Sequence, residues 1–298
     1  MSLPKVSVLI PTYNCAAYLN EAIQSVLDQT FHAFELIIVD NHSTDNTTEV
    51  VRMYLQDPRI MYYCNTSNLG LVGNWNKCLD YANGEYIKFL CADDIFHPRI
   101  LEKFVSVMEQ FPTVSLVCCY RREFGDVVCD RDAPFQYLQD GQKIIFETLN
   151  DRNWLGEPTT VMFRRSNLKV GGFKPGYTWI VDWEMWLRQL TVGDCYIIPE
   201  YLSLIRRHTS QVTELVFKNY IHSFEEYELC KAVIQNPDYN FKDPEKKMNA
   251  VLKRRARQFY KIMIKLLPKL TQASSRTAFR KAFNIIKKEN FFYKRREF

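Results

Sequence analysis

Short apolar runs alternate with segments of helical periodicity over the N-terminal two thirds of the chain. The apolar runs lie at residues 6–10, 34–39, 60–63, 86–90, 115–119 and 201–205. Between them, apolar side chains recur at helical spacing over 19–27, 50–55, 75–82 and 98–110. Near-continuous apolar runs are typical of strands that are buried on both faces of a sheet. Their alternation with helices predicts an α/β fold with a doubly wound, mainly parallel sheet flanked by helices.

Acidic side chains stand where two of the predicted strands end. Asp40 ends the second run, and Asp93 and Asp94 follow the run at 86–90. In open α/β sheets, ligands collect at the carboxyl ends of the strands. Buried carboxylates need a cation or strong hydrogen-bond donors. Asp93 and Asp94 therefore indicate a Mg²⁺ or Mn²⁺ site at which substrate phosphate oxygens would also coordinate the ion. An exposed Asp-Asp turn is the alternative.

The chain lacks the sequence fingerprints of dinucleotide-binding dehydrogenases and of P-loop NTPases. No Gly-x-Gly-x-x-Gly fingerprint follows the first strand, and the chain has no GxxxxGK[ST] phosphate-binding loop.

The nine cysteines form no CxxC pair, which is typical of reduced thiols in a cytosolic protein. No apolar run is long enough to cross a bilayer, and the N-terminus does not resemble a signal peptide. We therefore expect a cytoplasmic protein.

The net charge of +5 conceals an acidic body and a basic tail. Residues 216–298 carry 20 Lys and Arg against 8 Asp and Glu, whereas residues 1–215 carry 19 against 26. This shift predicts an α/β domain at 1–215 and a basic helical region at 216–298.

A helix is expected in the middle of this basic region. One helical stripe of it is apolar and contains Ala256, Tyr260, Met263, Leu267 and Leu270, and another contains Arg254, Arg257, Lys261 and Lys265. The pattern suits a helix on an anionic membrane surface, which would make the protein peripheral at the inner face of the membrane. The alternatives are a basic helix packed on the α/β domain by its apolar side and, as a lesser option, an RNA-binding surface.

Several short motifs occur in the order and spacing of one enzyme family. They are VSVLIPTYN at 6–14, SVLDQT at 25–30, FELIIVDNHSTDNT at 34–47, NLG at 68–70, ANGEYIKFLCADD at 82–94, GGF at 171–173 and VDWEMWLR at 181–188. Over residues 5–210 the chain therefore resembles the inverting family-2 glycosyltransferases. The resemblance implies a GT-A fold for the α/β domain and a nucleotide-activated sugar as donor.

The resemblance also implies nucleotide contacts. Pro11, Thr12 and Tyr13 would lie against the base, and Asp40 would bond a base edge. The alternative for Asp40 is that it caps the turn at 43–45.

The metal and the diphosphate are assigned in the same way. By resemblance Asp93 faces the ribose at the metal site, and Asp94 coordinates the Mn²⁺ or Mg²⁺ ion that bridges the diphosphate. Relatives often have an acid where this chain has Cys91, so the number of carboxylates at the metal is open. His208 and one of the two adjacent arginines, taken as Arg206, would belong to a basic loop that closes over the diphosphate.

The resemblance assigns the catalytic base to Asp182. This residue precedes Met185, Trp186 and Leu190, whose spacing predicts the apolar face of a helix. Asp182 would then lie at the helix N-terminus, where the helix dipole favours its ionised form. The alternative is that it serves only as an N-cap.

These assignments predict a metal-dependent inverting transfer of a sugar from a nucleotide diphosphate, most simply UDP, to an acceptor hydroxyl. The acceptor would be a saccharide or a lipid-linked glycan in cell-surface polysaccharide synthesis, and nucleic acid is not the expected partner. Two alternatives are a sugar-phosphate nucleotidyltransferase and a non-catalytic, membrane-associated protein that binds nucleotide-sugars. The first should have a Gly-rich basic loop after the first strand, where this chain has Pro11, Thr12, Tyr13 and Asn14.

Overall fold

The computed structural model describes residues 3–208, 216–217, 219–239 and 244–288, with side chains described from residue 250 in the last range. The chain divides into two compact units. The first comprises Met1–Gly176 and Val181–Thr209, and the second comprises Tyr177–Ile180 and Ser210–Phe298.

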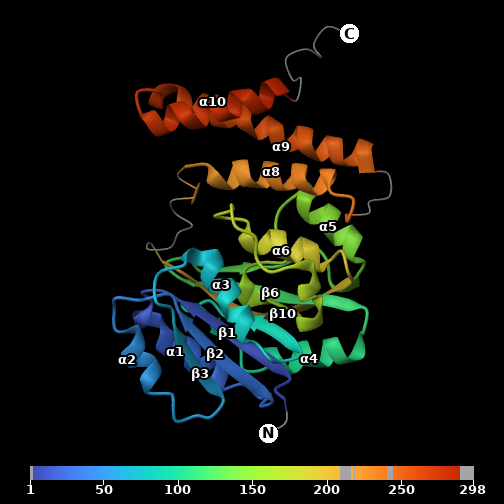
Figure 1. Cartoon of the computed structure of the whole chain (residues 1–298). Helices are drawn as coiled ribbons and strands as arrows, with labels where there is room; N and C mark the ends of the chain where they lie inside the picture. The colour runs from blue at the N-terminus through green and yellow to red at the C-terminus, as the bar shows by residue number, and fades with distance from the viewer. Residues whose placement is uncertain (1–2, 209–215, 218, 240–243, 289–298) are drawn as a thin grey trace. The chain divides into compact units, whose positions relative to one another are not determined.

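Four parallel strands form one half of the sheet in the first unit (Figure 1). They are β1 (Val6–Thr12), β2 (Phe34–Asp40), β3 (Ile60–Cys64) and β4 (Tyr86–Phe89), in the order β3-β2-β1-β4. The register pairs Val6 with Phe34 and Thr12 with Asp40. The carboxyl ends of these strands therefore share one edge of the sheet, where ligands bind in folds of this kind.

The other half of the sheet mixes parallel and antiparallel pairs. Its strands are β5 (Ile95–Phe96), β6 (Val114–Gly125), β7 (Cys129–Arg131), β8 (Tyr137–Gln139), β9 (Val161–Arg164) and β10 (Asp194–Arg207). Strand β9 runs antiparallel between β4 and β6, whereas β6 and β10 are parallel. The amino end of β9, entered from the 3₁₀ turn η1 (Pro158–Thr160), therefore lies beside the carboxyl end of β4.

Helices cover both faces of this sheet (Figure 1). They are α1 (Ala16–Leu27), α2 (Thr47–Arg52), α3 (Gly70–Tyr81), α4 (Ile100–Gln110), α5 (Gly141–Asn150) and α6 (Val181–Gln189), with the 3₁₀ turn η2 (Arg165–Val170). Successive side chains of a strand point to opposite faces. On one face, Val8 of β1 packs in a cluster with Leu19 of α1 and Phe104 of α4. On the other face, Trp75 of α3 contacts Phe89 of β4.

The predicted doubly wound α/β fold is confirmed, and each predicted strand of the first unit is present. The largest differences are in β6 and β10. Strand β6 continues past its apolar run through charged residues such as Arg121 and Glu123, and β10 begins at Asp194, well before the predicted run at 201–205. The sequence pattern does not predict β5, β7, β8 or β9. Each spans four residues or fewer, which is too short for a hydrophobic period to be recognised.

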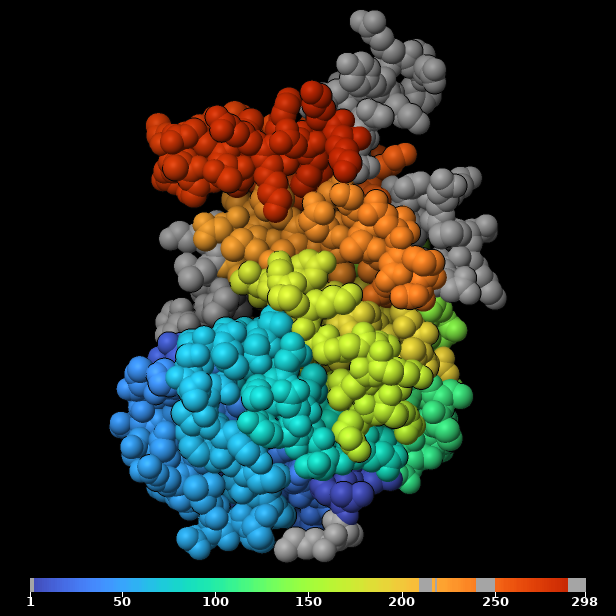
Figure 2. Space-filling view, viewed as in Figure 1, coloured from blue at the N-terminus to red at the C-terminus, as the bar shows by residue number. Residues whose placement is uncertain are grey.

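Helices α8 (Ile221–Gln235), α9 (Pro244–Leu266) and α10 (Ala273–Lys288) make up most of the described part of the second unit, with the 3₁₀ turn η3 (Leu267–Lys269). Helix α9 packs against both α8 and α10, as Figures 1 and 2 show. The Phe259 ring of α9 lies against Phe224 and Tyr227 of α8, with ring centroids 4.9 Å and 5.8 Å apart. An apolar seam therefore joins these two helices.

The apolar stripe predicted for this region is partly wrong. Ala256 is buried as expected, but Leu267 is 54% exposed. The buried face of α9 continues instead through Phe259, Ile262 and Leu266. The difference arises within the helix itself. Phe259 packs against the rings of α8, so the buried face is shifted by one residue, and Tyr260 and Met263 of the predicted stripe are only half-buried.

Candidate active site

The loop after β1 carries the residues expected at the nucleotide base. Pro11 and Thr12 end β1 opposite Val39 and Asp40 of β2. Thr12 is buried and its Oγ1 has no hydrogen-bond partner among the described residues, whereas the next residue, Tyr13, is 49% exposed. An exposed aromatic ring next to an unpaired buried hydroxyl suits a planar ligand with polar edges.

Asp40 lies at the end of β2 and is buried. Its Oδ1 accepts hydrogen bonds from the backbone N–H and the hydroxyl of Ser43, at 2.9 Å and 2.6 Å. Its Oδ2 accepts one from the Tyr62 hydroxyl at 2.8 Å. The two contacts with Ser43 are those of the turn-capping alternative, and a contact between Asp40 and a base edge stays a prediction.

Asp93 and Asp94 follow β4 and have different environments. Asp94 is 3% exposed, its Oδ1 accepts from the Arg206 N–H at 2.9 Å, and its Oδ2 accepts from the Thr159 hydroxyl at 2.5 Å. Burial and the negative charge of Asp93 raise the pKa of Asp94 well above its ordinary value. The Asp93 side chain is 21% exposed. Asp93 is thus the carboxylate that reaches solvent, and Asp94 is the one fixed by the protein.

The end of β10 brings Arg206 and His208 to the same place. Arg206 Nε donates to the backbone carbonyl of Asp93 at 2.9 Å, and its Nη2 donates to Glu21 at 2.9 Å. His208 Nε2 lies 3.1 Å from Asp93 Oδ2. Four predicted site residues, Asp93, Asp94, Arg206 and His208, are therefore in direct contact although the two segments are 112 to 115 positions apart in sequence.

The donor atoms of this cluster fit a divalent cation. Asp93 Oδ2 and His208 Nε2 lie 3.1 Å apart, within hydrogen-bond distance, and a carboxylate oxygen and an imidazole nitrogen are both groups that can bind a divalent cation. His208 Nδ1 is buried and has no partner among the described residues. Within the described ranges no group of three or more His, Cys, Asp or Glu side chains is gathered to hold a metal. Such an ion would therefore take much of its coordination from water and phosphate oxygens.

The sequence does not distinguish Arg206 from Arg207, but the two have different partners. Arg206 joins Asp93 and Asp94, whereas Arg207 Nη2 pairs with Glu123 and, at 3.1 Å, with Glu157. Adjacent strand residues point to opposite sides, so the two arginines serve separate clusters.

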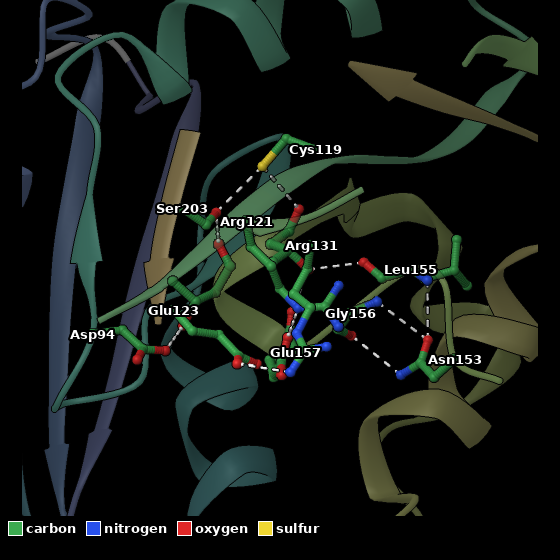
Figure 3. Close-up of polar contacts among 12 residues, drawn as sticks. Asp94, Cys119, Arg121, Glu123, Arg131, Asn153, Leu155, Gly156, Glu157 and Ser203 are labelled. Carbon is green, nitrogen blue, oxygen red and sulfur yellow. Dashed lines mark hydrogen bonds and ion pairs between the residues drawn. The ribbon is translucent and has the colours of Figure 1, made fainter. Parts of the chain in front are cut away.

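Glu157, just before η1, is at the centre of the second cluster, which the sequence does not predict (Figure 3). Glu157 pairs with Arg121 at 2.7 Å as well as with Arg207, and Arg131 pairs with Glu123 at 3.0 Å. Burial opposes ionisation of Glu157, but Arg121 and Arg207 outweigh it and keep its pKa below the ordinary value. The consecutive charged residues Arg121, Arg122 and Glu123, which follow the apolar run of β6, are the sequence signal of this cluster.

Asp182 lies in the first turn of α6, and its Oδ1 accepts a hydrogen bond from the Trp183 N–H at 2.6 Å. Burial raises the pKa of Asp182 to about 7. The hydrogen bond from the Trp183 N–H lowers this pKa, whereas the negative charge of Glu157 raises it further. Glu157 also adds to the raised pKa of Asp94. Its charge therefore acts on both the predicted base and the predicted metal carboxylate.

Residues 7–172, more than half of the chain, match the family model Glycosyl transferase family 2. The chain belongs to this family. It is similar to the uncharacterized protein MT1568 of Mycobacterium tuberculosis, with 34% identity over 220 residues that cover 70% of this chain and 68% of that protein. Family membership makes this protein a glycosyltransferase and decides against a nucleotidyltransferase.

Solved structures share the fold of this family-2 glycosyltransferase. S. aureus TarS 1-349 in complex with UDP-GlcNAc has a TM-score of 0.72 at 17% identity, over 95% of this chain and 81% of that one. The mannosyltransferase PcManGT of Pyrobaculum calidifontis, in complex with GDP-Man and Mn²⁺, has a TM-score of 0.58 at 16% identity, over 99% and 89%. The GT-A fold that the motifs imply is therefore confirmed.

Proposed function

We propose that this glycosyltransferase moves a sugar from a nucleotide diphosphate to an acceptor hydroxyl with inversion, in a catalytic domain at 1–215. The observation that carries the proposal is the contact of Asp93 and Asp94 with Arg206 and His208 at the carboxyl edge of the sheet. The carboxylates suit a cation, and the basic side chains suit a diphosphate.

The chemistry needs one base and one stabiliser of the leaving group. The acceptor oxygen attacks the anomeric carbon while the bond from that carbon to the diphosphate oxygen breaks. Asp182 takes the proton of the acceptor hydroxyl, and the diphosphate departs with the electron pair of the broken bond. A carboxyl whose pKa is about 7 is well matched to this task near neutral pH.

Mn²⁺ or Mg²⁺ would be held by Asp94 and Asp93, with His208 in contact with Asp93. When bound, the cation supplies charge that neutralises the departing diphosphate. Arg206 contacts Asp93 and Asp94, and we propose that this arginine also contacts the diphosphate of the donor.

UDP is the proposed nucleotide, supported by the fold shared with TarS, which is solved with UDP-GlcNAc. The base would lie against Pro11, Thr12 and Tyr13, with Asp40 at its edge. The observation that favours this loop is the exposed ring of Tyr13 next to the unpaired hydroxyl of Thr12.

The proposed acceptor is a saccharide or lipid-linked glycan at the cytoplasmic face of a membrane, in surface polysaccharide synthesis. Within the described ranges, none of the helices has the length and apolarity needed to span a bilayer. The basic region 216–298 would instead bind the anionic surface. Support comes from exposed apolar Ile264 and Leu267 beside exposed Lys261 and Lys265.

The proposal is tested with a panel of UDP-, GDP- and TDP-sugars in the presence and absence of Mn²⁺. Because a ligand that binds only the folded state raises its apparent stability, one donor should raise the melting temperature in a Mn²⁺-dependent way. Asp93→Asn should remove the Mn²⁺ dependence. If no donor shifts the wild-type protein with either cation, the proposed donor site is wrong.

A further inference from the structure

Thr159, in the turn η1 that leads into β9, connects the predicted metal carboxylate to the interior of the sheet. Thr159 is fully buried, as are the two side chains that hold its carbonyl, Lys88 of β4 and Ser203 of β10. The carboxylate that its hydroxyl contacts, Asp94, is 3% exposed. Solvent therefore plays little part in these contacts.

The direction of the Thr159 hydroxyl is fixed by its neighbours. Oγ1 accepts a hydrogen bond from the backbone N–H of Cys91 at 3.1 Å, and that group can only donate. Oγ1 also lies 2.5 Å from Oδ2 of Asp94, so the hydroxyl proton points at the carboxylate. With the Arg206 N–H on Oδ1 at 2.9 Å, each oxygen of Asp94 has its own donor. The carboxylate is thereby held in one orientation.

Thr159 is itself held through its carbonyl oxygen. That oxygen accepts hydrogen bonds from Lys88 Nζ and, at 2.9 Å, from the Ser203 hydroxyl. Lys88 Nζ also donates to the Val161 carbonyl at 3.2 Å and lies 4.7 Å from the centre of the Phe96 ring. An amine buried among apolar groups is costly. Its hydrogen bonds to two carbonyls of the η1–β9 segment are what offset that cost.

We propose that Thr159 is a positioning residue, whose hydroxyl fixes the carboxylate of Asp94 and whose place is set by Lys88. The inference rests on the proposed metal site and gives Thr159 and Lys88 a role that the resemblance does not assign to them. Partners that orient a metal-binding carboxylate typically change metal affinity by about 10- to 100-fold when they are removed. Thr159 and Lys88 would therefore control cation affinity without touching the cation.

The test compares two adjacent threonines of one turn. Thr159→Val keeps the shape of the side chain and removes the hydroxyl, whereas Thr159→Ser keeps the hydroxyl. Thr160→Val is the matched control, because Thr160 Oγ1 bonds only to the Leu155 and Glu157 carbonyls, at 2.8 Å and 2.7 Å, among the contacts of the described residues. Mn²⁺ is titrated against the full chain in the presence of UDP, with free Mn²⁺ followed by electron paramagnetic resonance.

We expect Thr159→Val and Lys88→Met to weaken Mn²⁺ binding by about 10- to 100-fold. Thr159→Ser and Thr160→Val should stay near wild type, and UDP binding without metal should change little in all four variants. Wild-type affinity in Thr159→Val, or an equal loss in Thr160→Val, would overturn the positioning role. If the wild-type protein itself takes up no Mn²⁺ with UDP, the proposed metal site fails first, and the positioning role fails with it.

Discussion

At the scale of single residues, the environment of Asp182, the proposed base, predicts how the reaction should depend on pH. The pKa of this carboxyl is raised to about 7, so the proton leaves it only as the pH rises through neutrality. A base must be ionised to accept a proton, and we therefore expect kcat/KM to rise with pH through an apparent pKa of about 7 and to level off above it. The measurement is kcat/KM between about pH 5.5 and pH 8.5. A profile that is flat across neutrality would show that Asp182 is not the titrating base.

At the scale of elements, the ion pair of Glu184 and Arg188 fastens α6 to the loop after η2. Both side chains are under 10% exposed and lie 2.8 Å apart. Arg188 also donates to the carbonyls of Val170, Gly171 and Gly172, at 2.6, 3.0 and 2.7 Å. The GGF motif is thus held by the helix that carries Asp182.

Removing Arg188 leaves the buried carboxylate of Glu184 with only the exposed Lys174, at 3.0 Å, and leaves three backbone carbonyls without their donor. We expect Arg188→Met to lower the free energy of unfolding by about 3–5 kcal/mol. Arg99→Met, which breaks an exposed pair with Glu102, is the matched control and should change it far less. Urea denaturation of both variants measures the free energy of unfolding. Equal losses in the two variants would contradict the stabilising role of Arg188.

The elements that the sequence predicts well are those with a long hydrophobic period. Strands β1 to β4 and helix α4 follow directly from apolar spacing, and Asp40, Asp93 and Asp94 are found because acids end two core strands. Strand β9 and the cluster around Glu157 are not predicted. Their positions depend on an antiparallel pairing between residues about 75 positions apart, for which local periodicity gives no signal. In the sequence, nothing distinguishes Lys88 from an ordinary strand residue, because its partners are backbone carbonyls of a distant segment.

At the scale of the whole molecule, the uneven distribution of charge predicts where the protein would meet a membrane. The second unit has exposed Lys261, Ile264 and Lys265 on α9. We expect the triple change Lys261→Gln, Ile264→Ser and Lys265→Gln to weaken binding to anionic vesicles, because each cation near the surface contributes about 1 kcal/mol.

The matched control for the vesicle experiment removes the same charge from the first unit. Lys143 and Lys169 are both exposed there, and Lys143→Gln with Lys169→Gln should leave vesicle binding nearly unchanged. Binding is measured by co-sedimentation at low and high salt, since screening should weaken it. Equal binding of the wild-type protein to neutral and anionic vesicles would contradict a membrane role for the basic region.

The central claim, sugar transfer with Asp182 as base, is tested most directly by Asp182→Asn. The change keeps the size of the side chain and its ability to accept from the Trp183 N–H, but removes proton uptake. Asp140→Asn is the matched control, because Asp140 caps α5 by accepting from the Lys143 N–H. Donor binding by calorimetry and the transfer rate are measured on both variants. We expect donor affinity near wild type in both, with turnover lowered by about 10²- to 10⁴-fold in Asp182→Asn alone. Undiminished turnover in Asp182→Asn would contradict the claim.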